Sequence, residues 1–312
     1  MAALICGSIA YDNIMVFKDR FRNHILPDKV HMLSVAFLVP ELRREFGGCA
    51  GNIAYNLKML GGEPLPMATV GKDFEPYKHW MDECDVTRRH ITIVDTEFTA
   101  QAFITTDLDD NQITAFHPGA MNFAHLNTIE DAENVQIGIV APDGRDGMIT
   151  HATQFHEAGI PFIFDPGQGL PMYDGEDLVR FIDQATWVTV NDYEWSLMLD
   201  RTGLSEAEIS SRVDALIVTK GGEGSDIMVG DRHLHIPAAP ISQMQDPTGC
   251  GDAYRAGLLY GLTHDMDWEI TGRIASLMGA IKAEQPGTQN HRFDRDSFSD
   301  RFKSAFAMEI GW

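Results

Sequence analysis

Short apolar runs alternate with helix-like stretches through the second half of the chain. Four of these runs are rich in β-branched residues and end in polar, Gly or Pro residues: VQIGIVAP (135–142), IPFIFDP (160–166), ATWVTVN (185–191) and ALIVTKGG (215–222). Buried strands separated by helices form parallel βαβ units. The pattern therefore predicts a parallel sheet, with helices over 148–158, 175–184 and 192–213. Ligands bind beyond the carboxyl ends of such strands, so we expect a site at the strand ends.

The first half of the chain has a different pattern. Residues 99–119 alternate in polarity around a polar turn at 108–111, which predicts a β-hairpin. Together with the runs IAYDNIMVF (9–17) and HMLSVAFLV (31–39), this hairpin predicts a small antiparallel sheet. Such a sheet is too small to be an independent domain and is better explained as a lid over the site.

The domain organisation follows from this pattern. We predict one α/β domain over residues 1–312, with a lid built from insertions at about 11–45 and 97–120. The lid sheet has edges that could pair across a homodimer.

Composition and charge exclude several classes of partner. The chain is 44% apolar and carries a formal net charge of −22, which argues against nucleic acid polymers and anionic membranes as partners. A single nucleotide remains possible, since a nest of backbone amides can hold phosphates in an acidic protein. The four cysteines show no metal-binding spacing, and the N-terminal residues read as a strand rather than a signal peptide. We therefore expect a cytoplasmic protein.

Two glycine-rich turns each lead into a predicted helix. They are FGGCAGNIAYNLKMLGG (46–62) and DPTGCGDAYRAGLLYGL (246–262). Glycines let backbone amides approach a ligand closely, and a helix N-terminus favours negative charge. In the second turn Asp252 lies at the edge of such an anion site.

Asp252 has two possible roles. An Asp near a helix N-terminus is often only a cap. Beside a bound phosphate, however, a carboxylate can accept the proton of an attacking hydroxyl, while the amides of Gly249, Cys250 and Gly251 stabilise the charge on the phosphoryl group. The chain has neither GxxxxGK[ST] nor a GxGxxG motif after a strand, so it is not a P-loop enzyme and a dinucleotide oxidoreductase is not expected.

The two glycine-rich motifs, with NDYE (191–194) and VTKGGEGS (218–225) in order between them, resemble the ribokinase-like (PfkB) family of ATP-dependent sugar and nucleoside kinases. The resemblance implies a doubly wound α/β core with a β lid, ATP and Mg²⁺ as co-substrates, and phosphorylation of an exocyclic hydroxyl. It also implies that Asp252 is the catalytic base and that residues 249–251 form the anion hole. Pro247 and Cys250 depart from the family pattern, which commonly has a hydroxyl residue and Ala there.

The resemblance assigns the remaining site residues. For ATP these are Asn191, Thr219, Gly221 and Gly224, with Asn191 and Glu194 positioning Mg²⁺ through water. For Asn191 and Glu194 the alternative explanation is a helix N-terminus that carries acidic residues. For Thr219, Gly221 and Gly224 it is a glycine-rich loop without a ligand. Carbonyls of Asp246, Thr248 and the 283–288 segment could hold a potassium ion.

On the acceptor side the resemblance implies contacts to the sugar hydroxyls from Asp12, expected at the end of the first strand, and from the Gly47, Gly48 and Asn52 turn. Gln168 lies at another strand end, and Phe116 in the lid could contact a base. Stretches such as GSIAYDNIM and FIFDPGQGLP are similar to the bacterial adenosine and nucleoside kinases of the family. We therefore predict an ATP-dependent nucleoside kinase that acts on a ribonucleoside 5′-hydroxyl. The alternatives are a sugar kinase of the same family and a catalytically silent nucleoside- or nucleotide-binding regulator.

Overall fold

The computed structural model describes residues 2–25, 32, 34–109 and 111–311. Its strands are β1 (Ala2–Cys6), β2 (Ala10–Val16), β3 (Glu41–Gly47), β4 (Glu63–Gly71), β5 (His90–Val94), β6 (Ala100–Thr106), β7 (Gln112–His117), β8 (Val135–Val140), β9 (Phe162–Phe164), β10 (Trp187–Asn191), β11 (Ala215–Thr219), β12 (Ser225–Val229) and β13 (Arg232–Ile236). Its α-helices are α1 (Cys49–Met59), α2 (Glu75–Glu83), α3 (Arg145–Ala158), α4 (Gly175–Gln184), α5 (Asp192–Thr202), α6 (Glu206–Ser210), α7 (Cys250–Thr263), α8 (Trp268–Ala283) and α9 (Arg295–Phe306).

The main sheet has the strand order β13-β12-β11-β10-β9-β8-β1-β4-β5. All its pairs from β11 to β5 are parallel, and β12 and β13 add antiparallel strands at one edge. The apolar runs of the second half thus form the strands that they predict. The predicted helix over 192–213 is divided in two, because Gly203 adopts a left-handed conformation (φ 68°) and ends α5.

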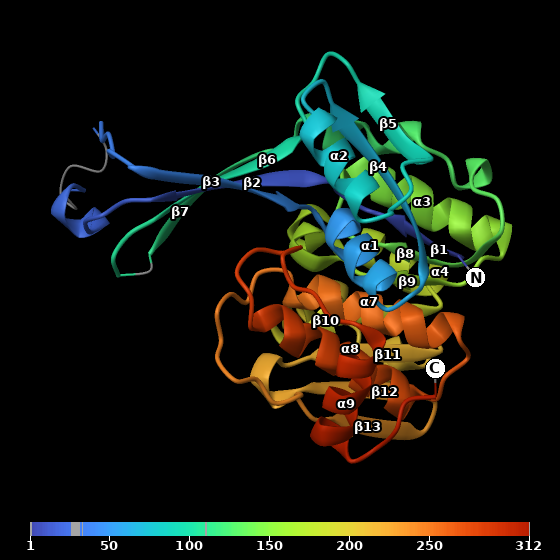
Figure 1. The fold of residues 1–312 in the computed structure, drawn as a ribbon. Coiled ribbons are helices and arrows are strands. Elements are labelled where there is room, and N and C mark those ends of the chain that lie inside the picture. The colour runs from blue at the N-terminus through green and yellow to red at the C-terminus, as the bar shows by residue number, and fades with distance from the viewer. Residues whose placement is uncertain (1, 26–31, 33, 110, 312) are drawn as a thin grey trace.

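Helices cover both faces of this sheet (Figure 1). Successive residues of a strand point to opposite faces, so each strand contributes to two cores. Ala3 and Ile5 of β1 belong to the core beneath α1, α2, α7, α8 and α9. Leu4 and Cys6 of the same strand belong to the core beneath α3, α4, α5 and α6. The chain therefore has the doubly wound α/β architecture.

A second sheet, with the order β3-β2-β6-β7, projects away from the main body (Figure 1). Its two outer pairs are antiparallel, as expected for the lid, whereas the central pair of β2 with β6 is parallel. The hairpin predicted within 99–119 is present as β6 and β7.

Two expectations about the lid strands are wrong. Of the strand expected over 31–39, residues 31 and 33 lie outside the described residues, and residues 34–39 form no strand. Phe37 instead packs on the rings of Phe17 and Phe21 at 4.8 and 5.0 Å between centroids. The strand is the charged segment that follows, β3, which is exposed over most of its length and so needs no apolar pattern. Asp12 lies within β2 rather than at the end of the first strand, because the chain leaves the main sheet after Cys6.

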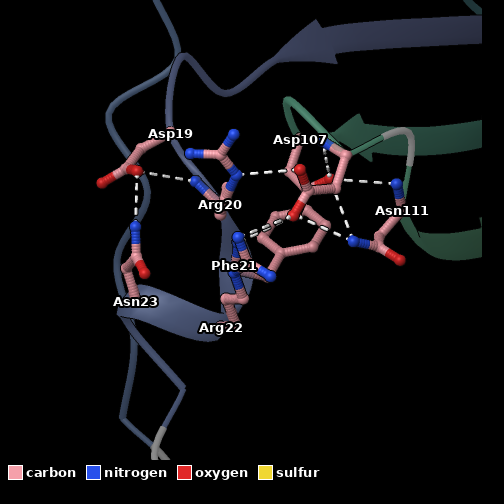
Figure 2. A network of polar contacts seen from close by, with 8 residues as sticks. Asp19, Arg20, Phe21, Arg22, Asn23, Asp107 and Asn111 are labelled. Atoms are coloured by element: carbon pink, nitrogen blue, oxygen red, sulfur yellow. Dashed lines mark hydrogen bonds and ion pairs between the residues drawn. The ribbon is translucent and has the colours of Figure 1, made fainter.

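Polar contacts organise the outer end of the lid (Figure 2). The Asp107 carboxylate accepts hydrogen bonds from the backbone N–H groups of Phe21, Asp109 and Asn111, each at 2.9 Å. Burial acts to raise the pKa of Asp107, but these bonds outweigh it and lower the pKa to about 2. Arg20 also pairs with Asp109 at 2.8 Å, so the two halves of the lid are fastened to each other.

Among the described residues, none of the helices has the length and apolar character needed to span a membrane.

Candidate active site

A cleft of about 910 Å³ lies at the carboxyl ends of the strands and extends to the inner end of the lid. Most of the residues predicted for the site line this one cleft: Asp12, Gly48, Asn52, Phe116, Gln168, Asn191, Glu194, Thr219, Gly221, Gly249, Gly251 and Asp252. The structure therefore brings the acceptor-side and nucleotide-side predictions together. Gly47, Gly224 and Cys250 are not among the residues that line it, and their surroundings explain why.

Asp252 occupies the first turn of α7. Gly249 precedes the helix as its N-cap with φ 80°, a conformation that favours glycine. The Asp252 Oδ2 atom accepts a hydrogen bond of 2.8 Å from the Asn52 side chain of α1. The Asp252 carboxylate of α7 is thus hydrogen-bonded to α1, and both helices begin at the cleft.

The surroundings of Asp252 suit a proton acceptor. Burial raises the pKa of its carboxyl group to about 6; the Asn52 hydrogen bond and Arg255 act against this rise, and Asp165 adds to it. A general base works best when its pKa lies near the working pH. Asp252 is therefore ionised at neutral pH and closer to protonation than an exposed Asp.

Asn52 is held by a buried network. Its Oδ1 atom accepts from Gln289 Nε2 at 2.9 Å, and Gln289 Nε2 also lies 2.7 Å from the Tyr77 hydroxyl. Gln289 Oε1 in turn accepts from the Trp80 indole at 2.7 Å. These contacts fix the side-chain amide so that its N–H₂ group points at Asp252. Asn52, for which the sequence predicts a contact with the sugar, is thus held against Asp252, and Gln289 was not predicted.

Arg255 and Asp165 form a buried ion pair at the floor of the cleft. Arg255 Nε and Nη2 each donate to the Asp165 carboxylate at 2.9 Å, and their side chains are only 6% and 3% exposed. Arg255 lies one helical turn after Asp252. Sequence analysis missed it, although a lone Arg in the apolar stretch DAYRAGLLYGL is the signal of a paired, buried charge.

The three residues predicted for the anion hole are placed differently in the structure. Gly249 and Gly251 line the cleft, but the Cys250 N–H donates to the Pro247 carbonyl at 3.2 Å. The Cys250 thiol lies 3.9 Å from the Asp246 carbonyl, away from the cleft lining. Burial raises the pKa of this thiol, so it is not an activated thiolate.

The acceptor side is built around Asp12. A Cβ on Gly47 would lie 2.6 Å from Asp12 Oδ2, so Gly47 leaves room for this carboxylate, and its predicted contact with a sugar stays a prediction. Gly48 has φ 86° and lies against the backbone of residues 8–10. Burial, followed by the negative charges of Glu45 and Asp246, raises the pKa of Asp12 to about 6. Such a carboxylate gains from hydrogen-bond donors such as sugar hydroxyls.

On the nucleotide side, Asn191 and Glu194 form a capping box at the start of α5. Glu194 N–H donates to Asn191 Oδ1 at 2.7 Å, and Asn191 N–H donates to Glu194 Oε2 at 2.8 Å. Both side chains also line the cleft. The helix-terminus explanation therefore accounts for their contacts to each other, and the cleft position remains compatible with a role toward a metal.

Gly224 has a structural role. It has φ 93°, and a Cβ there would lie 2.1 Å from the Ile236 carbonyl. Its predicted contact with ATP stays a prediction. Thr219 and Gly221 do line the cleft, while Lys220 pairs with Asp226.

Asp143 is a further cleft residue that sequence analysis did not single out. It follows β8 and is 2% exposed. Its Oδ1 accepts from the Gly144 N–H at 2.9 Å, whereas its Oδ2 has no partner among the described residues. Burial raises the pKa of its carboxyl group to about 8, so Asp143 is largely neutral at pH 7 and can donate a hydrogen bond.

The model of the pfkB family of carbohydrate kinases matches residues 13–294. The chain belongs to this family. A curated relative, the nucleoside kinase of Methanocaldococcus jannaschii, is 32% identical over 268 residues, which cover 85% of this chain and 88% of the relative.

Solved structures of family members share the whole fold. The Burkholderia thailandensis nucleoside kinase in complex with inosine has 51% identity and a TM-score of 0.90, covering 98% of this chain and 99% of that one. The same kinase in complex with ADP-inosine has 53% identity and a TM-score of 0.87, covering 98% and 97%. The ribokinase-like fold with a smaller lid sheet is thereby confirmed.

Proposed function

We propose that this protein is an ATP-dependent nucleoside kinase that phosphorylates the 5′-hydroxyl of a ribonucleoside such as adenosine or inosine. The observation that carries the proposal is Asp252, a carboxylate at a helix N-terminus in a cleft that joins the acceptor-side Asp12 to the nucleotide-side tips of β10 and β11. The named relatives support the same activity.

In this proposal the residues divide the phosphoryl transfer between them. Asp252 takes the 5′-hydroxyl proton as that oxygen forms its bond to the γ-phosphorus of ATP, and the bond from phosphorus to the β–γ bridging oxygen breaks to release ADP. The amides of Gly249 and Gly251 and the N-terminus of α7 stabilise the charge on the transferring group. Asn52 orients Asp252 by its 2.8 Å hydrogen bond.

The divalent ion is assigned to the Asn191 and Glu194 end of the cleft. These side chains offer oxygen atoms that could act as ligands of the ion. Burial raises the pKa of Glu194, and the nearby charge of Asp165 adds to this rise. Among the described residues no group of three or more His, Cys, Asp or Glu side chains could hold a metal alone. This suits Mg²⁺, which keeps several waters and binds mainly through phosphates. When bound, Mg²⁺ would neutralise charge on the ATP phosphates.

The cleft contains apolar surface in addition to hydrogen-bonding groups. Beside Asp12 and the glycine turn it includes the apolar side chains Phe116, Met121 and Met172. A nucleoside base needs such a surface, whereas a free sugar needs mainly hydrogen-bonding groups. This favours a nucleoside over ribose or fructose as the acceptor.

The test is ADP formation with MgATP and a panel of adenosine, inosine, guanosine, cytidine, ribose and fructose. We expect turnover with nucleosides, loss of turnover on chelation of the divalent ion, and no turnover with free sugars. Turnover with free sugars alone would replace the nucleoside by a sugar as substrate. Tight ATP binding with no turnover on any acceptor would support the regulator alternative.

Two further expectations stay predictions. A cytoplasmic location follows from composition alone. A homodimer would use the lid, in which β7 is exposed along its whole length.

A further inference from the structure

Lys282 is a fully buried lysine next to the anion-hole turn. It is the next-to-last residue of α8 and is 0% exposed. Its Nζ atom donates to the backbone carbonyls of Asp246 at 2.8 Å and Gln285 at 3.1 Å. A lysine is rarely buried unless its ammonium group is paired, so these two contacts require an explanation.

The carbonyls that hold Lys282 belong to the segments in which a potassium site was expected, namely Asp246 and residues 283–288. A monovalent cation at such a site is held by backbone oxygens that replace its hydration shell. The ammonium group is a compact point charge of the same sign and donates to two of these oxygens. The site expected from Asp246, Thr248 and residues 283–288 therefore does not fit a potassium ion in this chain, because a side-chain cation already uses two of its carbonyls, those of Asp246 and Gln285.

Lys282 contacts the first residue of the turn over 246–251, which carries the predicted anion hole. Asp246 begins this turn, and its carboxylate accepts from the N–H groups of Thr248 and Gly287, each at 2.9 Å. The N–H groups of Gln245 and Asp246 donate to the Ala283 carbonyl at 2.8 and 3.2 Å. Lys282 is the cationic member of this network, which fastens the start of the 246–251 turn to the end of α8.

Removal of the cation would leave the Gln285 carbonyl without its Lys282 donor and the Asp246 carbonyl with only the weak contact of the Cys250 thiol at 3.9 Å. An unsatisfied buried polar group destabilises the folded state, so the turn would move to find other partners. The amides of Gly249 and Gly251 follow within five residues of Asp246 and would move with it. The same change would also remove a positive charge from beside the phosphate site.

We propose that the Lys282 ammonium group is a tethered monovalent cation, which holds the 246–251 turn in its anion-binding conformation and makes the enzyme independent of potassium. Lys282 is thus a positioning residue, since it acts through the turn and not on the substrate. The inference rests on the proposed kinase activity of the cleft.

The first test uses the unaltered protein. Initial rates with MgATP and inosine are compared in potassium, sodium and tetramethylammonium chloride at equal ionic strength. We expect rates that agree within about twofold, because no site is left for a free cation. A rate several-fold higher in potassium than in the other salts would overturn the proposal.

The second test compares Lys282→Ala with Lys282→Met. Both should lose about 100-fold in rate in tetramethylammonium, by analogy with the loss of one oxyanion-hole donor. Potassium or ammonium should restore Lys282→Ala at least about tenfold, since the truncation leaves room for an ion among the carbonyls. Lys282→Met should not respond, because its side chain fills that room. The control Lys303→Met removes an exposed lysine that pairs with Glu309 and should keep the full rate.

ADP affinity and thermal stability of Lys282→Ala, measured in the same salts, give readouts that do not depend on turnover. We expect potassium to tighten ADP binding and to raise the unfolding temperature of this variant alone, or to permit its folding. If the unaltered protein shows no turnover, the kinase proposal fails while these two readouts still decide the role of Lys282. A folded Lys282→Ala that keeps its rate, or that responds to none of the salts, would overturn the inference.

Discussion

Asp252→Asn separates a catalytic carboxylate from a helix cap, because the two roles predict opposite effects on stability. The pKa of Asp252 is raised from 3.8 to about 6, which means that folding works against the ionised form. One pKa unit corresponds to about 1.4 kcal/mol, so keeping the carboxylate ionised in the folded protein costs about 3 kcal/mol at most. A neutral Asn of the same shape removes this cost and can still accept the Asn52 hydrogen bond.

The helix dipole acts in the other direction. A carboxylate in the first turn is favoured by about 0.3–1 kcal/mol, which is smaller than the cost of burying its charge. We therefore expect Asp252→Asn to be more stable than the unaltered protein by about 1–2 kcal/mol at pH 7.5 and to lose at least about 1,000-fold in kcat.

The stability gain has a defined pH dependence. A carboxyl group with a raised folded pKa destabilises the protein fully above that pKa, here about 6, and not at all below its unfolded value of 3.8. The gain in unfolding temperature should thus be present at pH 7.5 and shrink as the pH falls from 6 to 4. Scanning calorimetry measures it, with the exposed Asp300→Asn of α9 as the control. A variant that is less stable than the unaltered protein at pH 7.5 would refute the reasoning and give Asp252 a structural role in the first turn of α7.

Three other substitutions test the site. Asn52→Ala removes the hydrogen bond that lowers the pKa of Asp252, so the acidic limb of kcat/KM, expected near pH 6, should move to higher pH; an unmoved limb would show that another group controls it. Arg255→Met leaves Asp165 buried and unpaired and should reduce the unfolding free energy by about 3–5 kcal/mol in denaturant titrations, with partial recovery when Asp165→Asn is added; an unchanged midpoint would contradict this. Phe116→Ala should raise KM for inosine about tenfold and leave KM for ATP unchanged; equal effects on both would place Phe116 outside the base site.

The strands of the main sheet could be predicted from sequence because burial leaves a direct pattern there. Both faces of β8, β10 and β11 are covered, so these strands are continuous apolar runs and end where polar residues begin. The lid hairpin could still be predicted from its alternating polarity, but the third lid strand could not. Its strand β3 is charged and exposed, and the apolar run before it supplies ring packing at Phe37 instead of a strand.

The candidate site could be predicted only in part, for a related reason. Glycine-rich turns mark a backbone approach to a ligand, and they led to Asp252 and Asn52. Residues that act through tertiary contacts leave no local trace: Gln289 reaches Asn52, and Lys282 reaches Asp246, across long distances in sequence. The glycine pattern also predicts ligand contacts for Gly47 and Gly224, and it does not show that Gly47 leaves room for Asp12 and Gly224 for the Ile236 carbonyl.

The most direct test of the account is the position of the phosphate in the product. The protein is incubated with MgATP and inosine, the product is analysed by ³¹P NMR, and 5′-deoxyinosine is used as the matched acceptor without the reacting hydroxyl. We predict a 5′-monophosphate from inosine and no ADP above background with 5′-deoxyinosine. Phosphate on another hydroxyl, or ADP formation that is equal with both acceptors, would contradict the placement of the 5′-hydroxyl beside Asp252.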